Sequence, residues 1–430
     1  MEFVNHTSYP ALAFQGVDPL EQAFHVVVMR QSLTWGAAGQ LVPADVQAPL
    51  CEADEFFDGA TPLTSGSPRQ ESDLCHFKPR CDVIVNAVAH APVVAGRCAS
   101  RFDVRLVVQR PDAALSDGGG AVLLDKSLRV WGPRELRVAP GASALLRRAT
   151  LGLVQPVQRR LSEPTPQPCV PLRLELAFGG QAALLEVGRL RPEADRLRQE
   201  AFAANPNGCG WTHPAIFDAA HGQRLAAPQI EDPARPFSAN VFDALVQGKA
   251  DPNDPHLSHL VAGLGVRPKS HPDRLRLAGT IDQAFIDNDA PLPADFDFAV
   301  WNAAWPDQQL EHLQGDERIG LMNLCAPDTP GAWTDERGNT VLRLMLQPHG
   351  ALPFLLVRHD SGSIGELAMR LDTLLIAPEE RNVSLVWRAV LPLAPAVRAL
   401  ELRALSGAEV AACRASAAQA ESTAEGAFGG

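Results

Sequence analysis

Apolar and polar residues alternate strictly along several segments in the first part of the chain. The clearest segment carries four apolar residues on one face: Phe102, Val104, Leu106 and Val108. A period of two is typical of a sheet that has one face in water. Ala23–Trp35 is more continuously apolar and indicates a strand that is half-buried or buried. Positions 172–178 alternate as well, so residues 1–180 are predicted to form an N-terminal antiparallel β domain.

The same alternation returns toward the C-terminus. Apolar residues recur at every second position in 342–346 and 383–391, and 367–375 alternates in the same way with Thr373 among its apolar residues. The turn-forming residues at 378–382 separate the last two segments, which therefore predict a hairpin. We expect residues 331–400 to form a C-terminal strand set that packs on the rest of the chain.

The middle of the chain, residues 181–330, is rich in Pro, Asp and His and has only short periodic segments. Positions 192–204 have helical spacing, because Leu197 and Ala201 share a face and Pro192 suits a first helical turn. Residues 401–430 are rich in Ala, Ser and Glu and are predicted to be a flexible tail. The expected fold class is therefore mainly β, with antiparallel, sandwich-like sheets, a loop-rich middle region and a few short helices.

Charge and the N-terminal sequence restrict the classes of partner. The 430 residues carry a formal net charge of −12, which argues against a general nucleic-acid binder. The first residues lack the basic and apolar regions of a signal peptide, and no apolar run approaches the roughly 18 residues of a membrane helix. Eight cysteines without a Cys-x-x-Cys pair indicate free thiols. We expect a cytoplasmic protein that binds neither membrane nor nucleic acid.

Residue types that could carry chemistry occur without a convincing pattern. His359, Asp360 and Ser361 are adjacent in a predicted turn after a strand and point in different directions, so they do not form a triad. His256 and His259 have a metal-like spacing, but the prolines beside them favour a loop and a third ligand is missing. We predict no catalytic residues, no cofactor and no metal site.

Two carboxylates, Asp295 and Asp297, alternate with phenylalanines in a predicted loop. Such a pattern usually docks the aromatic rings, while the acids accept hydrogen bonds from nearby backbone N–H groups. The alternative is a pair of carboxylates for acid–base chemistry. With Glu317 as a further acid, this alternative predicts a β-sandwich hydrolase of glycans or esters.

Short sequence motifs, which we call words, follow one another along the chain in a recognisable order. They begin with Glu-Ser-Asp at 71–73 and Lys-Pro at 78–79, and they continue through Ala-Phe-Gly-Gly and Asn-Pro-Asn-Gly-Cys-Gly. Two later words are Leu-Pro-Ala-Asp-Phe-Asp at 292–297 and Pro-Asp-Gln-Gln at 306–309. The motif positions are Glu71, Ser72, Asp73, Lys78, Pro79, Gly179, Gly180, Asn205, Pro206, Gly208, Gly210, Asp295, Asp297, Asp307 and Gln308.

This series of words, spread over roughly residues 3–393, resembles the bacterial family catalogued as domain of unknown function 2169. The resemblance implies a non-enzymatic role in type VI secretion. Members of the family are thought to act as adaptors or chaperones that couple a secreted toxin effector to the spike protein of the apparatus. A structural part associated with the baseplate is a further alternative.

An adaptor needs a surface for its partners. The 181–330 region contains Trp211, Trp301 and Trp305 together with many arginines, and these residue types dominate interface energetics. We predict that the three tryptophans contact a partner. The alternative is that they pack the loops onto the sheet.

Overall fold

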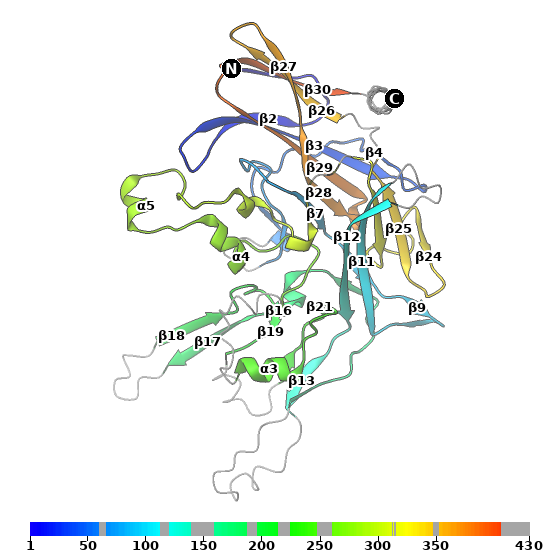
Figure 1. Cartoon of the computed structure of the whole chain (residues 1–430). Helices are drawn as coiled ribbons and strands as arrows, with labels where there is room; N and C mark the ends of the chain where they lie inside the picture. The colour runs from blue at the N-terminus through cyan, green and yellow to red at the C-terminus, as the bar shows by residue number, and fades with distance from the viewer. Residues whose placement is uncertain are drawn as a thin grey trace, which may run out of the picture.

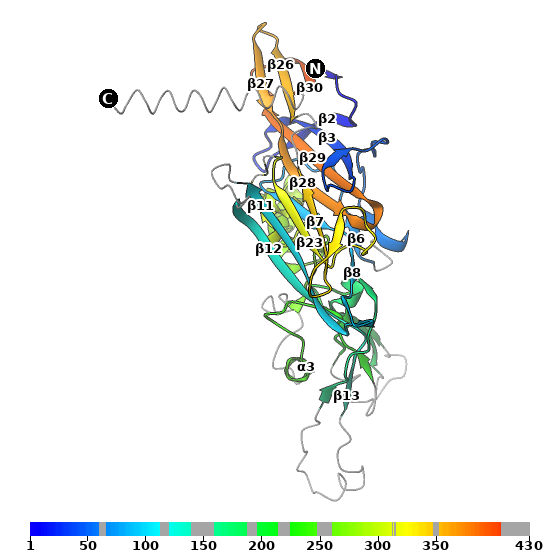
Figure 2. The same cartoon turned by 90° about the vertical axis from the view of Figure 1, so that its right-hand side faces the viewer.

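The computed structural model describes residues 1–59, 66–111, 120–138, 159–186, 196–213, 224–246, 260–311, 313, 315–346 and 352–405. The described chain is mainly β, which confirms the predicted fold class (Figure 1). Two large sheets form the centre of the molecule, and smaller sheets extend from it at both ends. The molecule is elongated, with β27 near one end and β13 near the other (Figure 2).

A seven-stranded sheet joins the two ends of the sequence. Its strand order is β2-β3-β29-β28-β7-β22, and β4 pairs with the far end of β3. The strands are β2 (Ala11–Val17), β3 (Ala23–Trp35), β29 (Asn382–Pro392), β28 (Arg370–Ala377), β7 (Cys81–Val85), β22 (Gln309–Leu310) and β4 (Leu41–Pro43). The predicted strand Ala23–Trp35 and the predicted hairpin around 378–382 are both confirmed. The pairing of β7 with β28 is parallel, so the sheet is mixed.

The second large sheet has the order β21-β12-β11-β23-β25-β24. Its strands are β21 (Ile230–Glu231), β12 (Gly120–Trp131), β11 (Arg101–Pro111), β23 (Arg318–Met322), β25 (Thr340–Met345) and β24 (Ala332–Thr334). The alternating residues of β11 are buried as predicted: Phe102, Val104, Leu106 and Val108. They belong to one continuous apolar cluster with residues of the seven-stranded sheet, so the two sheets share a core, as in a sandwich.

The centre of the seven-stranded sheet is buried on both faces. Val83 and Val85 of β7 belong to the core shared with the second sheet. Ile84, between them, belongs to a smaller cluster with Ala303 and Ala304. The loop-rich segment 260–308 therefore covers the far face of the sheet, which explains why all five residues of β7 are buried.

A four-stranded sheet forms one end of the molecule, with the order β1-β30-β26-β27. Its strands are β1 (Glu2–Asn5), β30 (Val397–Leu405), β26 (Leu352–His359) and β27 (Ile364–Ala368). β1 and β30 are parallel neighbours, so the N-terminal segment lies beside the last described strand. Residues 401–405 are thus part of a strand, contrary to the predicted tail, and 406–430 lie outside the described residues.

Glu401 of β30 makes the four-stranded sheet sensitive to acid. Hydrogen bonds from Arg358 and then from Arg403 lower the pKa of Glu401 to about 2. Because the folded pKa lies below the unfolded value of about 4.3, this contribution to stability is present above pH 5 and is lost as the pH falls toward 2. In urea unfolding, the stability difference between the native protein and Glu401→Gln should be largest at pH 7 and shrink by pH 3. A difference that does not change with pH would contradict this.

The other end of the molecule is built from smaller sheets. They are β14 (Arg159–Leu161) with β13 (Glu135–Val138) and β20 (Leu225–Ala226), β15 (Cys169–Pro171) with β8 (Val88–His90), β16 (Phe178–Gly179) with β19 (Cys209–Gly210), and β17 (Gln181–Glu186) with β18 (Arg196–Ala201). Two further pairs lie elsewhere, β10 (Arg97–Cys98) with β9 (Val93–Val94) and β5 (Glu55–Phe56) with β6 (Pro68–Gln70).

The described helices are short. They are α3 (Ala239–Val246), α4 (Pro272–Leu275) and α5 (Gln283–Asn288), with 3-10 turns η1 (Phe57–Gly59), η2 (Leu174–Leu176), η5 (Arg276–Ala278), η6 (Phe298–Trp301), η7 (Pro306–Gln308) and η8 (Pro378–Glu380). None of the helices in the described part of the chain has the length and apolar character needed to cross a bilayer. The seven cysteines within it are all free thiols, and Cys413 lies outside it.

Two predicted elements are wrong. The helix predicted at 192–204 is the strand β18, which pairs with β17 from Gln181↔Ala201 to Glu186↔Arg196, and 192–195 lie outside the described residues. The helical pattern depended on only two apolar positions, and hairpin pairing outweighs so weak a preference. The strand predicted at 172–178 is interrupted by the turn η2. Ser67 Oγ accepts a hydrogen bond from Leu174 N at 2.7 Å, which holds this turn.

The boundaries expected at 180 and 330 do not separate the sheets. β23, from the middle region, lies between β11 and β25, which come from the N-terminal and C-terminal regions. β28 and β29 from the C-terminal region complete the sheet that β3 and β7 begin. The strands of the three regions are therefore hydrogen-bonded into common sheets.

Candidate functional site

The far face of the seven-stranded sheet carries a cluster of buried polar side chains. We call this cluster the polar face and define it by one or two residues from each central strand: Arg30 on β3, Asp82 on β7, Thr373 on β28, and Ser384 and Arg388 on β29. These residues alternate with the apolar residues that fill the shared core. The period of two therefore sorts each strand into an apolar side and a polar side.

Asp82 is the most highly coordinated group of the polar face and is fully buried. It accepts hydrogen bonds from Lys78 Nζ at 2.9 Å, Asn302 Nδ2 at 3.0 Å, and the backbone N–H groups of Ala303 and Ala304 at 2.8 and 3.2 Å. Burial opposes the charge on Lys78, but Asp82, together with Cys75 and Asp372, outweighs burial and raises the pKa of this lysine. Asp82 thus ties the 302–304 segment to the sheet.

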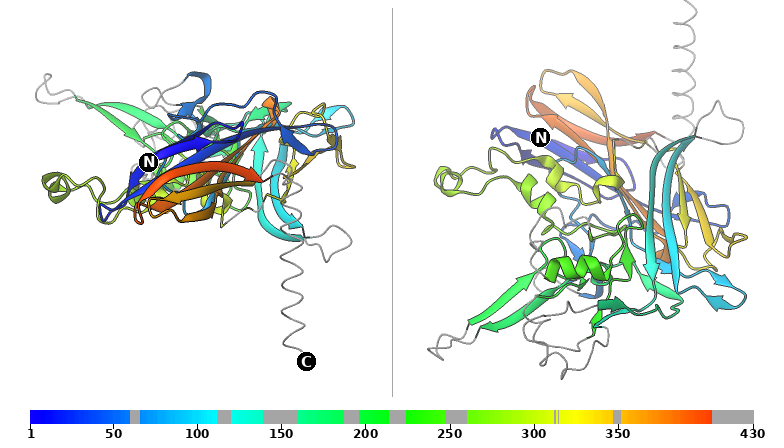
Figure 3. Two further views of the ribbon diagram at one scale, coloured as in Figure 1. Left: turned by 90° about the horizontal axis from the view of Figure 1, so that it is seen from above. Right: turned by 60° about the horizontal axis from the view of Figure 1, so that its bottom comes forward.

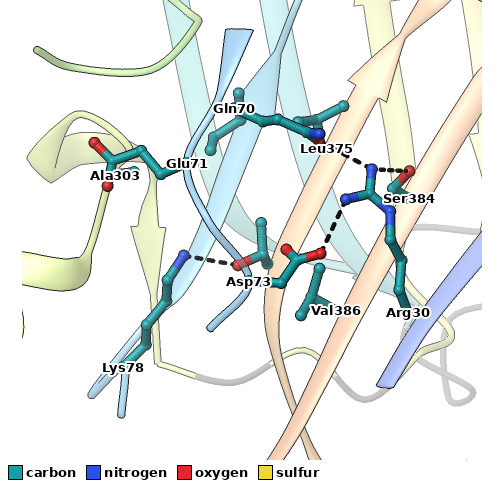
Figure 4. Close-up of a pocket in the computed structure, with 11 residues that line it drawn as sticks. Arg30, Gln70, Glu71, Asp73, Lys78, Ala303, Leu375, Ser384 and Val386 are labelled. Carbon is teal, nitrogen blue, oxygen red and sulfur yellow. Dashed lines mark hydrogen bonds and ion pairs between the residues drawn. The ribbon is translucent and has the colours of Figure 1, made fainter. Parts of the chain in front are cut away.

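Arg30 and Asp73 form a second buried ion pair, with 3.0 Å between Nη1 and Oδ2 (Figure 4). The other guanidinium nitrogen donates to Gln70 Oε1 at 2.9 Å and to Ser384 Oγ at 3.1 Å. Asp73 also accepts a hydrogen bond from Cys51 N at 2.8 Å. Each charge therefore has several partners, which is what a buried ion pair requires.

Arg388 extends the network along β29. Its guanidinium donates to Asp372 Oδ2 at 2.6 Å and to the carbonyl oxygens of Cys75 and Asp73 at 2.6 and 2.8 Å. Burial disfavours the cation, but Asp372, together with Cys75 and Asp73, outweighs burial and raises the pKa of Arg388. The loop at 71–78 is thus held to the sheet through its backbone as well as its side chains.

A fourth pair fastens the loop-rich segment to the same loop. Arg274 of α4 donates through both terminal nitrogens to Glu71, at 2.6 and 2.8 Å. It also donates to the carbonyl oxygens of Arg267 and Val300. Arg274 is 1% exposed and Glu71 is nearly buried, so this fork-shaped contact is well protected from water.

The polar face has almost no free space. The cavity beside Arg30, Asp73 and Lys78 has a volume of about 20 Å³, which is room for about one water molecule. The charges that line it are paired within the chain. The cluster is therefore built to hold the 71–78 loop and the 260–308 segment on the sheet, and the space is too small for a substrate.

The sequence words that predicted a family meet at this cluster. Glu71, Asp73 and Lys78 come from the first word, and Gln308 from a later one. Ser72 Oγ accepts from Leu74 N, and Pro79 follows Lys78 just before β7. Gln308 Nε2 donates to the carbonyl oxygens of Val83 and Leu264, at 2.7 and 2.9 Å, and Asp307 accepts from Lys126 Nζ at 2.7 Å. Residues more than two hundred positions apart therefore build one site.

Two other words meet at a second point. Gly179 and Gly180 follow Phe178 in β16, which pairs in parallel with β19 at Gly210. Asn205 is fully buried and donates through Nδ2 to the carbonyl oxygens of Leu174 and Phe178, at 2.8 and 3.0 Å. Pro206 and Gly208 continue the same turn, and the Gly208 N–H donates to Asn205 O. This turn therefore holds residues 205–210 against residues 174–179 through backbone hydrogen bonds and the Asn205 side chain.

The two carboxylates in the Asp-Phe-Asp word accept hydrogen bonds from nearby groups, as predicted. Asp295 accepts from the N–H and the hydroxyl of Thr280, at 2.8 and 2.7 Å. Asp297 accepts from Ala299 N at 2.8 Å. Glu317 is fully buried and bonded to Gly315 N. The three acids have different hydrogen-bond partners and are not held together as an acid–base pair.

The three predicted contact tryptophans are not equally accessible. Trp211 and Trp305 are 5% and 6% exposed, so they pack the loops onto the sheets. Trp301 is half-buried beside His76 and Phe296. Trp301 is therefore the most accessible of the three, and their contact with a partner stays a prediction.

Sequence reasoning missed Arg30, Arg274 and Asn302 as members of the buried network. Arg30 had a usable signal, because it is a charged residue in the apolar run of β3. Arg274 and Asn302 are in polar loops and had none. His359 ends β26 and is followed by a turn, as predicted. His256 and His259 lie outside the described residues, and elsewhere no group of three metal-ligating side chains occurs in the described ranges.

Comparisons with known proteins give one family. Searches of curated proteins and of solved structures return no match. A family model described as "Uncharacterized protein conserved in bacteria (DUF2169)" matches residues 21–388. This range contains the polar face, the Asn205 turn, the six-stranded sheet and most of the seven-stranded sheet. The chain therefore belongs to the bacterial family of domain of unknown function 2169.

Proposed function

We propose that this protein is a non-enzymatic adaptor, acting in the cytoplasm, that binds a secreted toxin effector and couples it to the spike protein of a type VI secretion apparatus. The proposal begins from the family resemblance. The observation that best supports a protein-binding role is an exposed apolar arm at residues 275–292, on which α5 lies.

The arm extends away from the two large sheets (Figures 1 and 3). Three large apolar side chains on it are exposed: Leu275 at 55%, Ile281 at 69% and Ile286 at 60%. Single exposed apolar residues are ordinary on protein surfaces, but three on one short projecting segment favour a contact with another protein.

The arm is held in place at its base. Thr280 is bound by Asp295, and Asp297 N donates to Leu277 O at 2.9 Å. Next to this point Phe296 and Phe298 pack edge to face, with 5.4 Å between ring centroids. A projecting segment with a fixed base loses less conformational entropy when it binds, which favours affinity. The Arg274–Glu71 pair connects the same base to the polar face.

The test is co-purification with the products of the neighbouring genes. The tagged protein should elute from a sizing column with a toxin or a spike protein. Changing both Ile281 and Ile286 to Asp should weaken the complex by about tenfold or more, because charges would enter an apolar contact. The melting temperature should not change, because both side chains are exposed.

Ile364→Asp is the matched control, because Ile364 is 57% exposed on β27, away from the arm. It should leave the complex intact. If the native protein elutes alone at low and at high salt, the adaptor proposal fails. If Ile364→Asp weakens the complex as much as the arm variant, the arm is not the contact surface.

A further inference from the structure

A cleft of about 460 Å³ lies on the side of the molecule where β12 meets the loop-rich segment. Its walls come from β12, from the loop after β21, from the chain before and within α4, and from η7. The residues that matter for the argument are Lys126, Arg235, Arg267, His271, Trp305 and Asp307. The volume lies within the range of ligand-binding sites, in contrast to the closed cavity of the polar face.

Arg267 is the unusual member of this cleft. It is 3% exposed, its buried Nε has no hydrogen-bond partner, and its guanidinium makes no ion pair with any residue that the structure describes. Only its backbone is engaged, through Ala303 O and Arg274 Nη1. Burial, together with the nearby Arg274 cation, lowers the pKa of Arg267 to about 10. The side chain is therefore still a cation at neutral pH, buried without a partner, at a cost to stability.

The other charges of the cleft already have partners. Lys126 is paired with Asp307 at 2.7 Å, and Arg235 is 3.5 Å from Asp232. The remaining two acids are paired outward, Asp125 with Arg105 and Asp273 with Arg276. His271 Nδ1 accepts from Asp273 N. Arg267 is thus the cation of the cleft without a direct ion pair among the described residues, although Asp273, Asp82 and Glu71 lie near enough to offset part of its cost of burial.

We propose that Arg267 binds a carboxylate carried by an acidic peptide segment of a partner protein. A guanidinium presents a planar fork that matches a carboxylate in two-point fashion. Four carboxylates line the same cleft, so a doubly charged phosphate would be repelled more strongly than a carboxylate. The volume exceeds that of one carboxylate group, which leaves room for the flanking peptide.

The walls also favour a peptide over a free small acid. Small-molecule pockets are lined mainly by apolar side chains, whereas eight of the fourteen residues around this cleft are Asp, Lys, Arg or His. Lys126 Nζ lies 5.4 Å from the centre of the Trp305 ring, which gives a flat wall with polar edges. α4, whose start lines the cleft, continues toward the exposed arm. The inference does not depend on the partner being an effector or a spike protein.

The test is fluorescence anisotropy with a labelled glycine-rich peptide that carries one glutamate, and with the same peptide carrying glutamine in its place. The full chain should bind the glutamate peptide and bind the glutamine peptide about tenfold or more weakly. Arg267→Met should weaken glutamate-peptide binding by a similar factor and raise the melting temperature, because it removes an unpaired buried cation. Arg267→Lys keeps the charge without the fork and should give intermediate binding.

Arg97→Met is the control, because Arg97 is an exposed arginine on β10 outside the cleft. It should leave binding unchanged. Equal binding by the native protein and Arg267→Met would overturn the proposal, as would a lower melting temperature for that variant. Acetate or inorganic phosphate that displaces the peptide when present at the same concentration as the peptide would overturn the assignment to a peptide carboxylate. The peptide is supplied directly, so failure of the co-purification would not affect this result.

Discussion

Replacing Asp82 by alanine is expected to lower the free energy of unfolding by about 3–5 kcal/mol. The change leaves the Lys78 ammonium buried without its counter-ion and removes the acceptor for Asn302 and for two backbone N–H groups. Removing one partner of a buried ion pair costs far more than the pair contributes, because the remaining charge stays out of water. The loss can be measured by urea unfolding at pH 7.

Asp125→Ala is the matched control. Asp125 also pairs with a cation, Arg105, but both side chains are more than 40% exposed. An exposed pair contributes only about 0–1 kcal/mol. The urea concentration at the midpoint of unfolding should therefore be nearly the same for this variant as for the native protein. Similar losses for the two variants would show that water reaches the polar face, and the cluster could not then hold the 71–78 loop and the 260–308 segment on the sheet.

Alternation along the sequence predicted much of the sheet structure, because each strand has one face in a shared apolar core. β3 matches its predicted bounds, and in β11 the four apolar residues predicted to share one face are all buried. One wrong element, the strand at 172–178, alternated as clearly as β11 but is interrupted by the turn that Ser67 holds. The other had few residues carrying its pattern. At 192–204 two apolar residues were the whole signal, and partner β17 decides the conformation there.

The partners of each strand were beyond prediction for a physical reason. β7 pairs in parallel with β28, almost three hundred residues later, and nothing local in either strand selects the other. The polar face depends on these pairings. Asp73 and Lys78 were singled out by a sequence word, but Arg30 and Asn302 become part of the site only when distant strands and loops are brought together.

Residue type alone also could not predict which large apolar side chains are exposed. Trp and Arg are common in interfaces, yet large rings also fill space beneath loops. Trp211 and Trp305 are buried, whereas the exposed apolar side chains of the arm are Leu and Ile. Composition could not separate these two uses, because exposure depends on how the loops lie on the sheet.

Gly179→Ala is expected to lower the free energy of unfolding by about 3 kcal/mol or more. Gly179 has φ of +150°, a conformation that side chains with a Cβ atom disfavour. An added Cβ would also lie 2.1 Å from the backbone oxygen of Asn205 and 2.9 Å from its Cβ. That oxygen accepts the Gly180 N–H at 3.0 Å, so it cannot retreat without breaking the turn.

Two other glycines separate the causes of this loss. Gly362 has φ of +84° but open space around it, so Gly362→Ala should cost only the backbone strain, about 1–2 kcal/mol. Gly365, in β27, has neither a positive φ nor a close neighbour, and Gly365→Ala should be neutral or slightly stabilising. If urea unfolding gives the same loss of free energy for Gly179→Ala and Gly362→Ala, the Asn205 turn moves to make room for the methyl group. A loss well beyond that of Gly362→Ala would mean that close backbone contact is what requires glycine in the Ala-Phe-Gly-Gly word.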